Sequence, residues 1–347
     1  MNAIESLAIV GGGITGLSAA YYAKRANPQL EITVVEAADR LGGVVQTVHR
    51  EGYCIEQSAD SFLATPEMPW ARQLVADLGL EDQLIGTRPE ARRALVLFRR
   101  RLHPVPTGFN LMGTTKSFPI WRSSLLSWKG KWRLLQEPRV PKRSPADREE
   151  SLAAFATRRV GQEAYERLVQ PLSAGIYAAD PTQLSVDAAL PQFVEMEQAF
   201  GSLAKGLAQR NRDAPSVSGA RYSKFLSLRK GLGPLVERLV TRLQDMGVKL
   251  ETQLTVTQID RPSRWRVSAG LKSQHADALI LACPPKPIRA MIGGLDPTLA
   301  ELLESIPSAT LAIVCLAYER GQLETWPSAS GFVVPAVESK GLIATSF

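Results

Sequence analysis

The chain has 347 residues, of which 45% are hydrophobic and 22% charged, and its net charge is +7 from 41 Lys and Arg against 34 Asp and Glu. This length predicts about two domains, and the composition is ordinary for a globular protein. No apolar run reaches the ~18 residues that a membrane-spanning helix needs. The three histidines and three cysteines match no metal, redox or hydrolase spacing, which argues against these kinds of site. The cysteines are expected to be buried thiols of a reducing compartment.

A basic charge balance suits nucleic acid, an anionic membrane surface or an acidic substrate. No zinc-finger, RNP-like or basic-helix pattern accompanies the charge, so no nucleic-acid partner is predicted. The chain opens on an apolar strand and not on a signal peptide. We therefore expect a cytoplasmic protein, peripheral to the inner face of the membrane.

Residues 4–43 predict a strand, a glycine-rich turn, a helix and a second strand. The turn contains G-x-G-x-x-G in Gly11, Gly13 and Gly16. The first glycine permits the tight turn, the second lets the backbone approach a pyrophosphate, and the third lets the helix pack on the strand. Glu36, twenty residues after Gly16, can bind the ribose hydroxyls of an adenosine. This context predicts a dinucleotide site and not merely a structural turn.

The residues after the second strand favour FAD over a nicotinamide dinucleotide. Arg40 can contact a phosphate with its planar guanidinium group, and the paired glycines Gly42 and Gly43 let backbone N–H groups approach the cofactor. The alternative is an ordinary surface turn.

Further along, residues 67–80 predict an amphipathic helix, and residues 91–106 a basic hairpin. Residues 107–143 then combine aromatic residues with cations. They include Trp121, Trp128 and Trp132 beside Arg122, Lys129, Lys131 and Arg133. This combination is typical of a helix in a lipid interface, so we expect monotopic membrane contact. The alternative is a helix packed on its own domain, with solvated cations.

Helical periodicity runs from about 149 to 170 and is expected to break at Pro171, and a further helix is expected over 187–209. Strand and helix patterns return over 223–260, and residues 276–285 read as a buried strand. The cofactor domain is therefore predicted to be discontinuous. The chain stops inside an apolar, strand-like stretch, 341–347, which predicts a C-terminally incomplete chain.

With these residues in view, the chain resembles the FAD-dependent protoporphyrinogen oxidases, within the wider family of flavin amine oxidases and phytoene desaturases. GGGITGL, Glu36 and RLGG are shared by that wider family. Four segments carry the specific resemblance: EQSADSFL (56–63), LHPVPTG (102–108), ERLVQPLSAGIYAADPTQLSVDAA (166–189) and FLSLRKGLGPLVERL (225–239).

The resemblance implies an α/β fold with a Rossmann-like FAD-binding domain, a substrate domain and a helical, membrane-associating insertion. The implied ranges are 1–85 and 223–286 for the FAD-binding domain, 86–106, 210–222 and 287–347 for the incomplete substrate domain, and 107–209 for the insertion. No metal is implied. The implied FAD contacts are Gly11, Gly12, Gly13, Ile14, Thr15, Gly16, Glu36, Ala37, Arg40, Gly42, Gly43, Val44, Ser58, Ala59, Asp60, Ser61 and Val256.

The resemblance also implies two substrate contacts. Gly175 would face the tetrapyrrole, the alternative being a helix-ending turn. Arg93 would bind a propionate, with Arg92 as its rival and a solvated surface arginine as the alternative.

The implied reaction is oxidation of protoporphyrinogen IX to protoporphyrin IX by O₂, with H₂O₂ as the second product. Coproporphyrinogen III, which has more carboxylates, is the alternative substrate. Arg99–Arg101 could serve the extra carboxylates, but the favoured interpretation of this run is solvated surface charge. Amine or carotenoid oxidation on the same fold, or an inactive, flavin-free fragment, remains open. A homodimer is compatible with the sequence.

Overall fold

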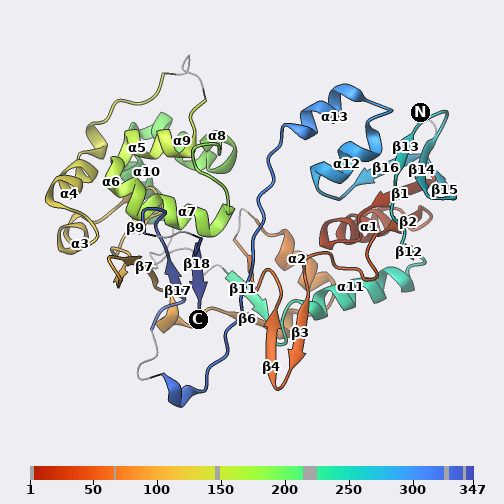
Figure 1. Ribbon diagram of the computed structural model, residues 1–347, viewed down its shortest axis with the longest axis horizontal. Coiled ribbons are helices and arrows are strands. Elements are labelled where there is room, and N and C mark those ends of the chain that lie inside the picture. The colour runs from red at the N-terminus through yellow and green to blue at the C-terminus, as the bar shows by residue number, and fades with distance from the viewer. Residues whose placement is uncertain (1–3, 66–67, 145–148, 214–224, 324–327, 339–340) are drawn as a thin grey trace. The chain divides into compact units, whose positions relative to one another are not determined.

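The computed structural model describes residues 4–65, 68–144, 149–213, 225–323, 328–338 and 341–347 (Figure 1). The chain divides into two compact units. Unit 1 consists of Met1–Gly86 with Phe225–Leu316, and unit 2 of Thr87–Lys224 with Ala317–Phe347. Each unit is thus assembled from two separate stretches of chain. The division into FAD-binding, substrate and helical parts stays a prediction.

Unit 1 is built on a four-stranded parallel sheet in the order β12-β2-β1-β16. In the centre, Val10 of β1 lies opposite Val35 of β2 and Leu281 of β16. Because the strands are parallel, their carboxyl ends meet at one edge, where the glycine turn begins. The sheet strands are β1 (Ser6–Val10), β2 (Glu31–Val35), β12 (Lys249–Glu251) and β16 (Ala278–Leu281).

Apolar side chains bury this sheet on both faces, as is usual for parallel sheets. Leu7 and Ile9 belong to the core formed with α1 (Ile14–Ala26) and α11 (Gly233–Asp245). Alternate residues of β1 face the other way, where Ala8 packs in a second core with the antiparallel sheet β13-β14-β15 and α12. That sheet consists of β13 (Gln258–Asp260), β14 (Trp265–Ala269) and β15 (Lys272–Ala276), and α12 spans Pro285–Ile292.

The remaining elements of unit 1 are short strands and two helices. The predicted amphipathic helix over 67–80 is confirmed as α2 (Trp70–Asp77). The others are β3 (Thr47–Arg50), β4 (Tyr53–Glu56), β5 (Phe62–Leu63), β6 (Leu84–Gly86), β11 (Phe225–Leu228), α13 (Pro297–Glu304) and a 3₁₀ turn at Glu81–Gln83.

Unit 2 combines a helical core with the four-stranded sheet β18-β17-β7-β8. The predicted basic hairpin is confirmed as β7 (Ala94–Phe98) and β8 (Arg101–Pro104). β17 (Gly331–Val333) pairs in parallel with β7, and β18 (Ala344–Ser346) pairs antiparallel with β17. Phe155, Leu168 and Val96 are fully buried in the common core of helices and sheet.

Helices make up most of the remainder of unit 2. They are α3 (Ser117–Arg122), α4 (Trp128–Leu135), α5 (Leu152–Val160), α6 (Gln162–Ala164), a π-helical turn (Tyr165–Val169), α7 (Gln170–Tyr177), α8 (Val186–Ala189), α9 (Pro191–Phe200) and α10 (Leu203–Asp213). Three 3₁₀ turns (Pro89–Ala91, Glu137–Arg139 and Arg320–Gln322) and the strands β9 (Phe109–Asn110) and β10 (Gly113–Thr114) complete the list of described elements.

Three predictions about secondary structure are wrong. Pro171 does not break its helix, because the π-helical turn directly before it leads without interruption into α7, and a π-helical turn accommodates the missing N–H of the proline. The region 187–209 is expected to be a single helix but contains parts of three, α8, α9 and α10. One of the breaks occurs at Gly201, which adopts a left-handed backbone conformation with φ +64° between α9 and α10. Val256, which is expected in a strand within the 223–260 pattern, lies outside the described strands, two residues before β13.

The cysteines are free thiols, but the expectation that all are buried is wrong. Cys54 and Cys315 are exposed, and only Cys283 is partly buried. In the described part of the chain, no helix is long and apolar enough to cross a lipid bilayer.

Candidate functional site

The glycine turn between β1 and α1 can be formed only by small residues. Gly11 has φ +112° and donates its N–H to the Val35 carbonyl at 2.8 Å. A Cβ on Gly11 would overlap the Ala282 carbonyl, and a Cβ on Gly16 would overlap the carbonyl of Gly11. These two glycines therefore allow the turn and the close approach of α1 to the sheet.

The N-terminus of α1 is open for an anion. Gly13 caps the helix without a side-chain hydrogen bond, so the N–H groups of the first turn, including those of Ile14 and Thr15, have no capping partner within the helix. Gly13 is also uncrowded, because an added Cβ would meet only the Cα of Gly43, at 3.8 Å. Free N–H groups and the positive end of the helix dipole fit a pyrophosphate at this position.

Glu36, directly after β2, is held by two backbone N–H groups. Its Oε2 accepts from Gly12 at 2.7 Å and its Oε1 accepts from Ala38 at 2.8 Å. Each oxygen keeps a second lone pair, so the carboxylate can still accept hydrogen bonds from ribose hydroxyls. Ala37 is exposed beside it.

The segment after Glu36 folds back onto the glycine turn. Gly42 donates its N–H to the Gly12 carbonyl at 2.8 Å, and a Cβ on Gly43 would lie 3.0 Å from the Cα of Gly13. The Arg40 guanidinium donates to the Gly43 carbonyl at 2.6 Å, which stabilises this loop. Val44 is 74% exposed, which leaves an apolar side chain for a ligand to cover.

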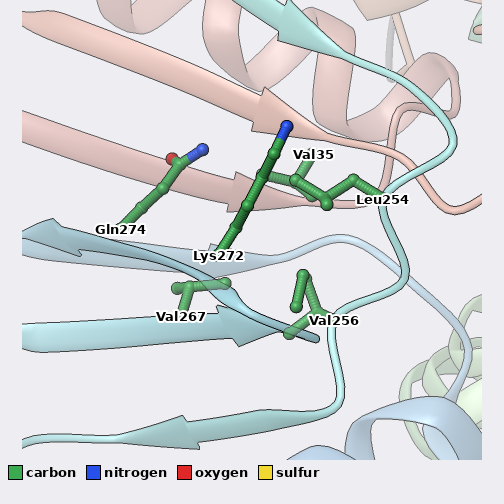
Figure 2. A pocket seen from close by; sticks show the side chains of 7 residues that line it. Val35, Leu254, Val256, Val267, Lys272 and Gln274 are labelled. Atoms are coloured by element: carbon green, nitrogen blue, oxygen red, sulfur yellow. The ribbon is translucent and has the colours of Figure 1, made fainter.

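A third segment, which directly precedes β13, is joined by backbone hydrogen bonds to the chain that follows β2. Leu254 donates its N–H to the Glu36 carbonyl at 2.9 Å, which brings Val256 close to the carboxyl end of β2. Figure 2 shows the Val256 side chain beside a cavity that is also lined by Val35, Val267 and Lys272. The cavity measures about 10 Å³, room for roughly one water molecule and not for an adenine. Because the Val256 side chain is directed there, its backbone stays available for the predicted contact with the adenine.

The turn at Ser58–Ser61 contains an unsatisfied polar atom. Asp60 accepts the Ser61 hydroxyl at 2.8 Å, and its carbonyl accepts the Ser227 hydroxyl at 2.6 Å, while Ala59 is exposed. The Ser58 hydroxyl is buried and finds no hydrogen-bond partner among the residues with described positions. Buried polar groups are normally satisfied, so this hydroxyl fits a polar group of a bound cofactor.

Cys283 follows β16 next to this site. Burial raises the pKa of its thiol, and the nearby charge of Glu36 raises it further. The thiol therefore stays protonated at neutral pH, and the sequence pattern did not indicate its position.

Together these segments define a dinucleotide-binding α/β protein of the Rossmann-like class. The chain belongs to the family of flavin containing amine oxidoreductases, whose model matches residues 14–346. It is thus an FAD-dependent oxidoreductase, and the open helix N-terminus, Glu36 and the unsatisfied Ser58 hydroxyl fit that cofactor.

Within this family the chain is similar to porphyrinogen oxidases. The coproporphyrinogen III oxidase of Bacillus subtilis (strain 168) is 35% identical over 337 residues, which cover 95% of this chain and 70% of that protein. The protoporphyrinogen oxidase of Homo sapiens is 29% identical over 354 residues, 98% of this chain and 72% of that protein. A provisionally named protoporphyrinogen oxidase from Exiguobacterium sp. 255-15 has a crystal structure that matches with a TM-score of 0.77 and 29% identity, over 99% of this chain and 73% of that one.

The two predicted substrate residues both lie in unit 2. Arg93 immediately precedes β7, and its carbonyl accepts the N–H and the hydroxyl of Ser330, at 2.9 and 3.0 Å. Its side chain is exposed, whereas the Nε of Arg92 donates to the Thr87 carbonyl at 3.3 Å. Gly175 is exposed inside α7, where an added Cβ would lie 3.5 Å from Val333. The alternative role predicted for Gly175, that of ending a helix in a turn, is therefore wrong.

The sequence pattern does not predict an aromatic pair that forms next to the strand following Arg93. Phe332 lies opposite Leu95 in the β17–β7 register, and its ring is 5.9 Å from that of Phe347. Side chains alternate along β7, so Leu95 points to the same face of the sheet as Phe332, and Arg93 lies directly before the start of this strand. Parallel pairing of segments more than 200 residues apart creates this face, and no local pattern could have indicated it.

Proposed function

We propose that this protein oxidises a porphyrinogen to the corresponding porphyrin with O₂. The observation that carries the proposal is the similarity to porphyrinogen oxidases over almost the whole chain, at 29–35% identity. The amine oxidases of known structure are more distant: the cyclohexylamine oxidase of Brevibacterium oxydans IH-35A is 17% identical with a TM-score of 0.59, which shows the fold alone.

The sheet face of unit 2 supports a large, apolar substrate that carries carboxylates. The exposed guanidinium group of Arg93 can bind a propionate, and Phe332 and Phe347 offer flat apolar area to the macrocycle. Gly175 lies over Val333, on the face of the sheet opposite to Phe332, and is proposed as a separate contact of the tetrapyrrole at the exposed surface of α7. These residues bind and orient the substrate and keep water from it.

The bound flavin would supply the redox chemistry, taking two electrons at a time as a hydride equivalent and passing them to O₂. The protein has to hold the cofactor at the carboxyl edge of the unit 1 sheet. Gly11–Gly16, Glu36, Arg40, Gly42–Gly43 and the Ser58–Ser61 turn are proposed to do so. With the cofactor held in this way, the proposed oxidation needs no pair of acidic and basic side chains to transfer protons.

Two porphyrinogens compete as the substrate. The resemblance to protoporphyrinogen oxidases predicts that the substrate is protoporphyrinogen IX. The coproporphyrinogen III oxidases of B. subtilis, Staphylococcus aureus and Propionibacterium freudenreichii, at 35%, 30% and 32% identity, favour coproporphyrinogen III as the second candidate.

An anaerobic titration tests the proposal. The purified, FAD-supplemented protein is mixed with protoporphyrinogen IX or coproporphyrinogen III, and the flavin absorbance is followed. Bleaching of the bound-flavin band by one of them identifies the substrate. Bleaching by a primary or methylated amine instead would identify an amine oxidase, and a spectrum of free flavin would favour the flavin-free alternative.

We further infer that the enzyme works in the cytoplasm, peripheral to the inner face of the membrane, because a porphyrinogen is poorly soluble in water. The helical part of unit 2 is proposed as the membrane-associating part. A homodimer remains compatible with these features and is tested by light scattering of the purified protein.

A further inference from the structure

Two side chains of the β3–β4 hairpin are bonded to the start of α11. Glu56, the last residue of β4, lies opposite Thr47 of β3 in the hairpin register. The Glu56 Oε1 accepts the N–H of Leu232 at 2.5 Å, and its Oε2 accepts the Thr47 hydroxyl at 2.8 Å. The Thr47 hydroxyl oxygen also accepts the N–H of Gly233 at 2.7 Å. The hairpin, which lies beside the start of α11 in Figure 1, therefore caps this helix from outside.

This cap is part of the fold and not a loose surface contact. Leu232, at the N-cap position of α11, makes no side-chain hydrogen bond with the helix. The first N–H groups of a helix have no partner within it, and the helix dipole stabilises a carboxylate beside them. Gly231 has φ +84°, and an added Cβ there would overlap the Thr47 side chain and the Glu56 Oε1. Glycine therefore allows the hairpin to approach the helix this closely.

The turn Ser58–Ser61, which is proposed to contact FAD, is held at both ends by the same stretch of chain. Its start lies two residues after Glu56, which is bonded to the beginning of α11. At its other end, the Asp60 carbonyl accepts the Ser227 hydroxyl of β11 at 2.6 Å. Between these ends, the Ser58 hydroxyl finds no hydrogen-bond partner within the described part of the chain. β11 and the start of α11 thus fix the position of this hydroxyl.

α11 is a fixed reference for that turn. Leu235, Leu239 and Leu243 bury one side of the helix in the core of unit 1. Val236 of its first turn lies against Gly42, where an added Cβ would be 2.8 Å from the valine side chain. The helix is therefore held by the core and by the loop proposed to contact the pyrophosphate. Glu56 transmits this fixed position to the turn on the other side of the hairpin.

We propose that Glu56 and Thr47 are positioning residues for the flavin. They are not among the proposed FAD contacts, and they act through the Ser58–Ser61 turn, which they hold against α11. The Glu56 carboxylate is the central group, because it accepts hydrogen bonds from both the helix and Thr47. This inference rests on the proposed placement of FAD at Ser58–Ser61 and adds two residues that the family resemblance does not imply.

Paired substitutions test this role in the full chain. Thr47→Val keeps the shape of the side chain but removes the hydroxyl that bonds Gly233 and Glu56. Thr47→Ser keeps the hydroxyl and removes only the methyl group. Glu56→Gln removes the charge, and its matched control is Glu51→Gln, an exposed carboxylate between β3 and β4.

Two signals of FAD are measured together with the Tm of the apoprotein. Glu56→Gln and Thr47→Val should weaken FAD binding roughly tenfold, because each loses a hydrogen bond made by the charged carboxylate. Both should also change the visible circular dichroism of the FAD-saturated protein, which a merely structural cap would leave unchanged. Thr47→Ser and Glu51→Gln should bind FAD within about twofold of the wild type.

A double-mutant cycle shows whether the effect of Glu56 passes through the turn. Ser58→Ala removes the unsatisfied hydroxyl and should itself weaken FAD binding. Glu56→Gln combined with Ser58→Ala should bind FAD at most about twofold more weakly than the weaker single variant, because coupled residues are not additive. Glu56→Gln combined with Gly13→Ala should show the product of the two single effects, because Gly13 belongs to the pyrophosphate end of the site.

The positioning role is overturned if Thr47→Val binds FAD like the wild type while Thr47→Ser binds weakly, since packing and not the hydroxyl would then matter. Independent effects of Glu56→Gln and Ser58→Ala, or a lower Tm with unchanged FAD signals, would overturn it as well. If Glu56→Gln does not fold, Thr47→Val carries the same test with the carboxylate in place.

These outcomes are separable from failure of the proposed function. The measurements use FAD without a porphyrinogen, so a wrong substrate leaves the positioning role standing. Weak FAD binding in Ser58→Ala with normal binding in Glu56→Gln would keep the proposed FAD placement and remove the role of Glu56. Full FAD affinity in Ser58→Ala would contradict the placement itself and the positioning role with it.

Discussion

The Glu36 carboxylate accepts the Gly12 N–H at 2.7 Å, so the residue expected to bind ribose also holds the glycine turn. The same carboxylate accepts the Ala38 N–H at 2.8 Å, which fixes the start of the following loop. One side chain thereby orders two of the four segments proposed to surround FAD, the glycine turn and the loop after β2. Removal of this charge should therefore weaken FAD binding more than it slows the reaction catalysed by the FAD-bound protein.

Glu36→Gln should weaken FAD binding roughly 10- to 100-fold, because hydrogen bonds to a charged group contribute about 1.5–3 kcal/mol and the new NH₂ group cannot accept. The dissociation constant is measured by the quenching of flavin fluorescence. Glu31→Gln, at the exposed start of β2, is the matched control and should leave it unchanged. Equal affinity in the Glu36 variant would show that this carboxylate does not contact the cofactor.

Gly13→Ala should separate cofactor binding from folding. Its Cβ would meet nothing of the protein closer than 3.8 Å, so the stability of the apoprotein should change by less than about 1 kcal/mol, while FAD affinity falls at least about tenfold. Gly16→Ala should instead destabilise the apoprotein by roughly 3 kcal/mol or more, because its Cβ would overlap the Gly11 carbonyl. Urea unfolding and flavin titration give the two quantities. Unimpaired FAD binding by Gly13→Ala would place the pyrophosphate elsewhere.

Arg93→Gln should raise the KM for the porphyrinogen roughly 10- to 100-fold with a smaller change in kcat, since a carboxylate anchor far from the reacting carbon contributes mainly binding. Arg92→Gln should leave KM nearly unchanged, because the Nε of Arg92 already donates to the Thr87 carbonyl. Steady-state kinetics with both porphyrinogens measure the difference. The reverse result would assign the anchor to Arg92.

The glycine turn could be predicted from the sequence because its requirements are local. Gly11 adopts a positive φ, and Gly16 lies so close to the Gly11 carbonyl that no side chain fits between them. Both residues belong to one strand–turn–helix unit, so a short stretch of sequence is enough to predict them. The open N-terminus of α1 follows from the same pattern. The hydrogen bonds from Gly11 to Val35 and from Gly12 to Glu36 are the parts of this turn that depend on the second strand.

Features that depend on distant segments could not be predicted in this way. The pairing of β17 with β18 brings Phe332 and Phe347 together, and the pairing of β17 with β7 places Phe332 opposite Leu95. A local rule predicts that Pro171 breaks its helix, but the π-helical turn before it leads directly into α7. The exposure of Cys54 likewise depends on its place in a two-stranded sheet and not on its neighbours in sequence.

Acid should destabilise the protein in part through Asp187. Hydrogen bonds from the Arg143 guanidinium, at 3.1 and 2.8 Å, hold the pKa of the Asp187 carboxyl below its ordinary value of 3.8. A lowered pKa in the folded state means that this stabilisation is present above that value and is lost as the pH falls through the folded pKa. Asp187→Asn should therefore lower the Tm at about pH 7 and converge with the wild type towards about pH 2–3. Asp245→Asn, at the exposed end of α11, is the control and should follow the wild type throughout. A constant difference between Asp187→Asn and the wild type at every pH would mean that the charge of Asp187 does not stabilise the fold.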